Sequence, residues 1–153
     1  MASSSNASNA SNASIARRFM TELWTHHNPQ IIQDVIEPTH VLRMGAQTLE
    51  GRKTIRRLYD TYHRAFPELT LQIGNLVSEG PQVALMYTME GTHSGPLRDI
   101  KPTERRVQWI GLSILRLENE MITETTTLWD ELHLMEQLGV ISETETEAAR
   151  VPM

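Results

Sequence analysis

Apolar residues in the first half of the chain recur at the spacing of α-helices. After Ser14, a good N-cap residue, they return every few positions over residues 15–24 and predict a helix with one apolar face. A short second helix is predicted over residues 29–36, because Pro29 is suited to the first helical position. Residues 51–66 carry a third helical stripe, with basic side chains on the opposite face.

From residue 69 onward the pattern changes to the alternation that is typical of β-strands. The segments predicted to form strands are 40–44, 69–77, 83–89, 106–117 and 121–130. A last helical turn or two is predicted over residues 132–139. Helices come first and antiparallel strands follow, which predicts the α+β class. The sequence shows neither βαβ alternation nor a Gly-rich phosphate loop, so a parallel nucleotide-binding sheet is not expected.

Composition separates one globular domain, residues 15–141, from two tails. Residues 1–14 repeat Asn, Ala and Ser and carry little apolar surface, so we predict a disordered low-complexity tail. Residues 142–153 are predicted to form an acidic C-terminal tail. The length of 153 residues fits a single domain, since domains cluster near roughly 100–150 residues.

Charge and cysteine content exclude several classes of protein. The chain has 14 Lys and Arg against 19 Asp and Glu, a net charge of −5, so we expect no nucleic-acid partner. It has no Cys, which removes thiol catalysis, zinc ribbons and disulfide scaffolds. No apolar run approaches the roughly 18–20 residues of a membrane span, and the start lacks a secretory signal. A cytoplasmic domain without membrane contact, metal or cofactor is therefore expected.

The last two strands bring polar groups together if Asn119 and Glu120 form a two-residue hairpin turn. Paired residue numbers then sum to 239, which places the following residues on one face of the sheet: Trp109, Gly111, Ser113, Glu124, Thr126 and Asp130. Leu112 and Ile114 point to the other face. A one-residue slip in this register would exchange the faces.

Two carboxylates among apolar side chains suggest a cavity rather than a packed core, since an unpaired buried charge is costly. Apolar walls would raise the pKa of such a carboxylate toward the range of acid/base catalysis. The alternative is that Asp130 caps the helix that follows it, and the spacing alone favours this cap. His93, in a Gly-bounded loop, is either a turn residue or a group at the rim of the cavity.

Several short motifs, in order, resemble the SnoaL-like polyketide cyclases, which are also described as predicted ester cyclases. The motifs are Ile36-Glu37-Pro38, Ala65-Phe66-Pro67-Glu68-Leu69, Glu79-Gly80-Pro81, Gly91-Thr92-His93-Ser94-Gly95, Ile122-Thr123-Glu124, Trp129-Asp130-Glu131-Leu132 and Gln137-Leu138-Gly139. The resemblance runs from about Ile15 to Gly139.

The resemblance implies a nuclear-transport-factor-2-like α+β cone, in which N-terminal helices pack on a curved, mostly antiparallel sheet around an apolar cavity. It also implies a homodimer through the sheet and cofactor-independent intramolecular aldol chemistry. The family's acid/base aspartate maps onto Asp130, so with the resemblance a functional role outweighs the cap. The chain departs from the family at Thr126, where many relatives have Trp, and at Arg116, the position nearest the family's histidine.

We therefore predict an acid/base enzyme acting on a small, apolar, polyketide-like carbonyl compound, with Asp130 as its catalytic residue. The residues predicted to line the pocket are Trp24, Met44, Tyr62, Trp109, Ser113, Glu124 and Thr126, with His93 at the rim. Two alternatives remain. One is a non-catalytic domain that binds a small molecule or a partner. The other is an epoxide hydrolase that uses Glu124, Asp130 and Arg116.

Overall fold

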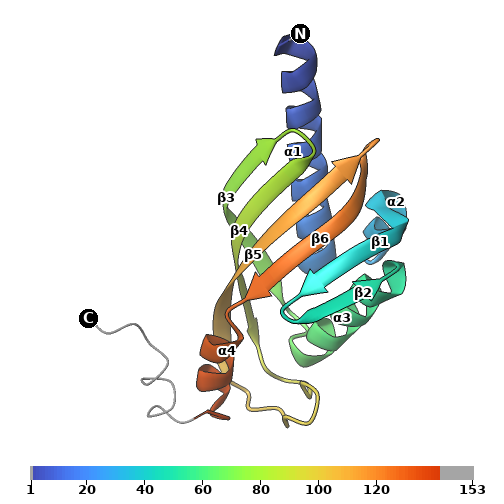
Figure 1. Cartoon of the computed structure of the whole chain (residues 1–153). Helices are drawn as coiled ribbons and strands as arrows, with labels where there is room; N and C mark the ends of the chain where they lie inside the picture. The colour runs from blue at the N-terminus through green and yellow to red at the C-terminus, as the bar shows by residue number, and fades with distance from the viewer. Residues whose placement is uncertain (1, 142–153) are drawn as a thin grey trace.

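The computed structural model describes residues 2–141, which form a six-stranded sheet with three helices on one side and a fourth at the end of the sheet (Figure 1). The helices are α1 (Ala2–Trp24), α2 (Gln30–Val35), α3 (Arg52–Ala65) and α4 (Glu131–Leu138). The strands are β1 (Ile36–Met44), β2 (Gln47–Glu50), β3 (Thr70–Glu79), β4 (Gln82–Thr92), β5 (Arg106–Glu118) and β6 (Met121–Trp129). The described helices include none that is long and apolar enough to cross a membrane.

The strands follow the order β2-β1-β6-β5-β4-β3, and only β1 and β6 run parallel to one another. The predicted strands of the second half are confirmed, as is the α+β class. Strand β2 was not predicted, because its four residues are all exposed and show no apolar alternation. It pairs with β1 across a tight turn in which Gly45 adopts a positive φ of 60°.

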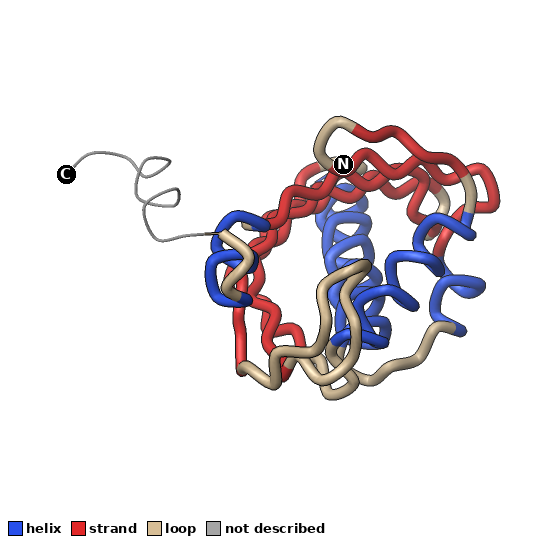
Figure 2. Tube along the Cα trace, turned by 90° about the horizontal axis from the view of Figure 1, so that it is seen from below, coloured by secondary structure: helices blue, strands red, loops and turns tan. Residues whose placement is uncertain are grey.

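The three N-terminal helices gather on the concave side of the sheet (Figure 2). The core lies between the helices and this side of the sheet, and it is built largely from aromatic and aliphatic side chains. The largest fully buried ones are Trp109, Tyr62, Tyr87, Phe66, Leu23, Ile31, Ile32, Ile36, Leu69, Leu85, Met89 and Leu97.

Helix α1 begins earlier than expected. The structure places residues 2–14 in the helix, whereas the sequence predicted a disordered tail there. The repeat contains no Pro or Gly, and its Ala residues favour helix. Once packing has fixed the buried part of α1, extending the helix adds one hydrogen bond for each residue ordered. The acidic tail predicted at residues 142–153 lies outside the described residues.

The last hairpin has the predicted turn but not the predicted register. Asn119 and Glu120 both have positive φ, and Glu118 pairs with Met121 as expected. The register then shifts next to Arg116, which pairs with Glu124, so that one extra residue is inserted in β6. Because side chains alternate along a strand, this bulge exchanges the two faces of β6 beyond it.

The corrected register turns Thr125, Thr127 and Trp129 toward the helices. Ser113 pairs with Thr127, and both are buried. Glu124 and Thr126, which were predicted to line the cavity, lie on the outer face instead. Glu124 forms an ion pair with Arg43 there, at 3.6 Å.

Gly111 is expected to tolerate no side chain, because Tyr87 crosses it on the neighbouring strand. A Cβ atom at Gly111 would lie 2.6 Å from the Cζ atom of Tyr87, whose hydroxyl is already hydrogen-bonded to Ser113 and Trp129. We expect Gly111→Ala to lower the free energy of unfolding by roughly 1–3 kcal/mol in urea titrations. Gly74→Ala is the control, since its Cβ would meet nothing closer than 3.6 Å. Equal stability of the two variants would contradict this packing.

Candidate active site

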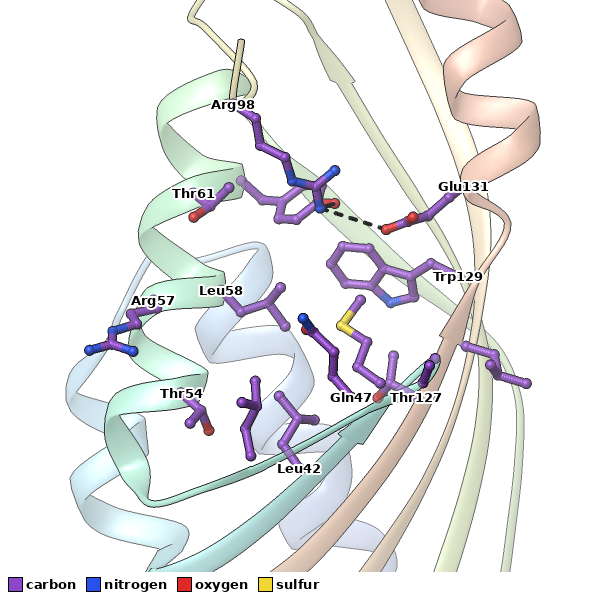
Figure 3. Close-up of a pocket in the computed structure, with 16 residues that line it drawn as sticks. Leu42, Gln47, Thr54, Arg57, Leu58, Thr61, Arg98, Thr127, Trp129 and Glu131 are labelled. Carbon is purple, nitrogen blue, oxygen red and sulfur yellow. Dashed lines mark hydrogen bonds and ion pairs between the residues drawn. The ribbon is translucent and has the colours of Figure 1, made fainter. Parts of the chain in front are cut away.

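A pocket of about 570 Å³ opens between α3, the β1–β2 hairpin and the end of β6 (Figure 3). We call it the outer pocket. Its apolar walls include Leu42, Met44, Leu58 and Trp129. Polar groups enter from α3, from the loop between β4 and β5, and from the start of α4. A cavity of this size with a few convergent polar groups is typical of a site for a small molecule.

Tyr62, Arg98 and Glu131 form the polar side of the outer pocket. Tyr62 lies on α3 and is fully buried, and an Arg98 Nη2 atom lies 3.4 Å from its hydroxyl oxygen. The same guanidinium is 3.8 Å from the Glu131 carboxylate, and Figure 3 shows the two side chains reaching toward each other. Burial raises the pKa of Tyr62 to about 12, so its hydroxyl stays protonated near neutral pH and can donate a hydrogen bond.

His93 holds the loop that carries Arg98. Its backbone N–H donates to the Arg105 carbonyl, and its Nδ1 atom accepts from the Thr103 N–H at 3.2 Å. The backbone N–H of Glu104 donates to the His93 carbonyl, which closes the base of the loop. The His93 side chain is fully buried and does not line the outer pocket, so the structure does not bring it to the rim.

A second, much smaller cavity of about 20 Å³ lies deeper, between the helices and the sheet. We call it the inner chamber. Helix α1 supplies apolar walls, among them Phe19 and Trp24. The sheet supplies four hydroxyl groups, those of Tyr87, Ser113, Thr125 and Thr127.

Three of the hydroxyls at the inner chamber, those of Tyr87, Ser113 and Thr127, form one hydrogen-bonded chain, whereas that of Thr125 is bonded to the Nε2 atom of His40. The Tyr87 and Ser113 oxygens are 2.7 Å apart, and those of Ser113 and Thr127 are 2.8 Å apart. The indole N–H of Trp129 donates to the Tyr87 oxygen at 2.9 Å. Such a network is stable in an apolar setting only because its members satisfy each other.

Four of the predicted pocket residues line one or the other of these cavities. Met44 and Tyr62 line the outer pocket, and Trp24 and Ser113 line the inner chamber. Trp109 is buried in the core, where its ring packs near those of Tyr62, Phe66 and Trp129.

Asp130 does not lie where the 239 register placed it, opposite Trp109 on the concave face. It is exposed and is the N-cap of α4, where its carboxylate accepts a hydrogen bond from the backbone N–H of His133 at 3.1 Å. The cap alternative is thus confirmed, while a catalytic role for Asp130 stays a prediction. Arg116 and Glu124 are paired neighbours facing away from the helices, so the set proposed for epoxide hydrolysis does not converge on the outer pocket.

Sequence reasoning missed Arg98, Glu131 and Trp129. Arg98 sits in a loop, and neither periodicity nor a motif marks it. Glu131 is the first residue of α4, directly after the N-cap, where an acidic side chain is common for structural reasons and carries no signal of a site. A register with one extra residue in β6 would have predicted Trp129, because that bulge turns its indole to the concave face of the sheet. Among the described residues, no cluster of three or more His, Asp or Glu side chains is arranged to hold a metal ion.

Comparison with solved structures shows the same fold in proteins of low sequence identity. A candidate SnoaL-like polyketide cyclase from Jannaschia sp. CCS1 superimposes with a TM-score of 0.80 at 18% identity, over 88% of this chain and 95% of that one. AclR, a candidate hydroxylase from Streptomyces galilaeus, gives 0.80 at 22% identity, over 92% and 90%. IdmH, a candidate polyketide cyclase from Streptomyces antibioticus, gives 0.72 at 21% identity, over 84% and 98%.

These similarities establish the fold alone, and among curated proteins none matches the sequence. The family assignment comes from the sequence itself. The profile of the SnoaL-like polyketide cyclases matches residues 14–138, which is most of the chain and includes every residue of the outer pocket. This protein therefore belongs to the SnoaL-like polyketide cyclase family.

Proposed function

We propose that this protein is a cofactor-independent enzyme that closes a ring in a small, largely apolar dicarbonyl compound by intramolecular aldol chemistry. Family membership supports the reaction class, and the apolar walls of the outer pocket support the substrate class. The observation that carries the proposal is the meeting of Tyr62, Arg98 and Glu131 on one side of that pocket. A carboxylate beside two hydrogen-bond donors is the arrangement that enolate chemistry needs.

Each of the three residues has one role. The Glu131 carboxylate removes a proton from the carbon next to a carbonyl. The Tyr62 hydroxyl and the Arg98 guanidinium donate hydrogen bonds to the enolate oxygen that forms. The enolate carbon then attacks the second carbonyl of the same molecule and forms the new carbon–carbon bond. The resulting alkoxide takes up a proton from water, and Glu131 releases its proton to water, so ring closure leaves the carboxylate regenerated and no proton gained or lost.

Ring closure of heptane-2,6-dione to 3-hydroxy-3-methylcyclohexanone, followed by NMR, tests this proposal. We expect the wild-type protein to accelerate closure above the buffer rate. Tyr62→Phe should lower turnover about tenfold, the worth of one hydrogen bond, while Arg98 remains. Tyr59→Phe is the matched control, because the Tyr59 hydroxyl donates to the His27 carbonyl away from the outer pocket. Binding of the dione without turnover would favour the non-catalytic binding domain.

We also propose that the protein forms a homodimer through the outer face of the sheet. This face exposes a group of large apolar side chains, namely Val77, Met86, Ile110, Leu112, Ile114 and Leu128. Leu128 is 60% exposed and Ile110 is 53% exposed, which is unusual for a face in contact with water alone.

Charges on the outer face do not oppose such pairing. Three arginines there are each bonded to a glutamate of the same chain, in the pairs Arg43–Glu124, Arg106–Glu90 and Arg116–Glu118. In a two-fold symmetric dimer the same patch meets itself, so unpaired charges would face like charges. Here the arginines are neutralised within each chain, and two copies of the face can meet without that repulsion.

Sedimentation at micromolar concentration is expected to give roughly twice the chain mass of 17.4 kDa. Leu112→Lys should yield monomers, because Leu112 lies between Met86 and Leu128 in the paired strands and a buried unpaired ammonium is costly. Val140→Lys, at an exposed site after α4, should leave the dimer intact. A wild-type monomer would contradict the proposed interface.

A further inference from the structure

The inner chamber and the outer pocket share four wall residues, which are Leu42, Leu58, Thr127 and Trp129. The chamber is thus the deep end of the same site, and these side chains stand at the boundary between the two spaces. Trp129 is fixed there by its hydrogen bond to Tyr87 and by edge-on ring contacts with Tyr62 and Trp24, at centroid distances of 4.7 and 5.7 Å.

The chemistry of the chamber differs from that of its surroundings. Ser113, Thr125 and Thr127 are 5% exposed or less, yet they lie opposite aliphatic and aromatic side chains of α1. Apolar side chains at these positions would fill the centre of the sheet equally well, and they would leave no buried hydroxyl in need of a hydrogen-bond partner. The hydroxyls are already bonded within the protein, but a hydroxyl can form up to three hydrogen bonds. Thr127, which bonds to Ser113 and lines both cavities, therefore keeps capacity for a polar occupant.

The volume of the chamber limits what that occupant is. A cavity needs about 10–15 Å³ to hold one water molecule, and the chamber measures about 20 Å³. A single oxygen atom fits this space, whereas a ring or a branched alkyl group does not. Hydroxyl groups both donate and accept, so they can complete the hydrogen bonds of one oxygen without any charge.

We propose that the inner chamber is an oxygen-binding subsite that holds the second carbonyl oxygen of the substrate. This inference rests on the proposed function and adds to it where the second of the substrate's two carbonyl oxygens is held. One lies at Tyr62 and Arg98, and the other reaches past Trp129 to the hydroxyl of Thr127. Trp129 sets the depth of the site, so the inner end of the substrate carries a small carbonyl group.

Binding of two probes of equal carbon skeleton tests the subsite. The first is 1-phenylbutane-1,3-dione, which is too short to close a ring by aldol addition. The second is 1-phenylbutan-1-one, which lacks the second carbonyl. Dissociation constants are measured by ligand-observed NMR for the wild type and for variants that each lose one hydroxyl.

Thr127→Val should weaken binding of the dione about fivefold, the loss of one hydrogen bond, and leave binding of the monoketone within about twofold. Thr61→Val is the matched control, because Thr61 lines the outer pocket but not the chamber, and it should not change the ratio of the two constants. Ser113→Ala repeats the test at a second hydroxyl if the valine variant does not fold.

Equal effects of Thr127→Val and Thr61→Val on both probes would overturn the subsite while leaving the proposed function in place. Failure of the wild type to bind either ketone would overturn both, because the outer pocket would then not be a carbonyl site. Selective loss of dione affinity in Thr127→Val is the result that the subsite predicts.

Discussion

Replacing Glu131 by Gln is expected to lower the turnover of heptane-2,6-dione by roughly 10²–10⁴, the usual contribution of general acid–base catalysis. The amide keeps the size of the side chain and can still accept a hydrogen bond from Arg98, but it cannot take up the proton. The substrate's KM should change little, since the pocket walls stay in place. Steady-state kinetics of the purified variant measure both quantities.

Asp130→Asn is a close control. Asp130 and Glu131 are neighbours in the sequence, but only the Glu131 carboxylate lines the outer pocket. Asp130 caps α4, and Asn is an equally good cap, so stability should be kept. Turnover should stay within about twofold of wild type, the scatter expected for a neutral surface change. The opposite result, with activity lost in Asp130→Asn and kept in Glu131→Gln, would return the catalytic role to the carboxylate that the family resemblance selected.

Acidification from pH 7 to pH 4 is expected to remove about 3 kcal/mol of stability through His40 alone. His40 is fully buried on β1, and burial lowers its pKa from 6.5 to about 4. The unfolded chain binds the proton below pH 6.5 whereas the folded chain does not until about pH 4. The stabilisation is therefore complete above pH 6.5 and declines as the pH falls toward 4. Burial also lowers the pKa of His63 to about 4, so it acts in the same direction.

Urea unfolding at pH 7.0 and 4.5 isolates the His40 contribution. The Nε2 atom of His40 lies 2.8 Å from the Thr125 hydroxyl, so both partners are replaced together in His40→Leu/Thr125→Val, which leaves neither polar group unpaired. This variant should lose less stability on acidification than wild type does. His133→Gln, at an exposed site on α4, should keep the full pH dependence. An unchanged slope in the double variant would show that His40 is not the buried neutral group described here.

Apart from the exposed strand β2, the order of helices and strands could be predicted, because the other elements carry an apolar period of their own. The register of the last hairpin could not be, although its turn was correct. The segment Thr123–Thr127 contains four threonines and one glutamate, so neither face differs in polarity and nothing in the pattern reveals the extra residue. A single bulge then moved Glu124 and Thr126 out of the site and brought Thr127 and Trp129 into it.

Only part of the candidate site could be predicted, because only some of its residues lie on elements with a clear apolar face. Tyr62 and Met44 lie on elements whose apolar faces could be recognised, so their inward direction followed from helical and strand spacing. Arg98 and Glu131 come together only through the fold, because the loop that carries Arg98 is shaped by backbone bonds to His93 and packs against α3. Contacts of this kind between distant segments leave no periodic signal in a single sequence.

Exchange of the α-protons of 4-phenylbutan-2-one in D₂O, followed by NMR, tests most directly whether Glu131 is the base of the outer pocket. This ketone has one carbonyl and cannot close a ring, so the measurement isolates proton removal from every later step. We predict faster deuterium uptake with the wild type and with Asp130→Asn, and uptake at the buffer rate with Glu131→Gln. Acceleration that survives in Glu131→Gln, or that is absent from the wild type, would contradict the account.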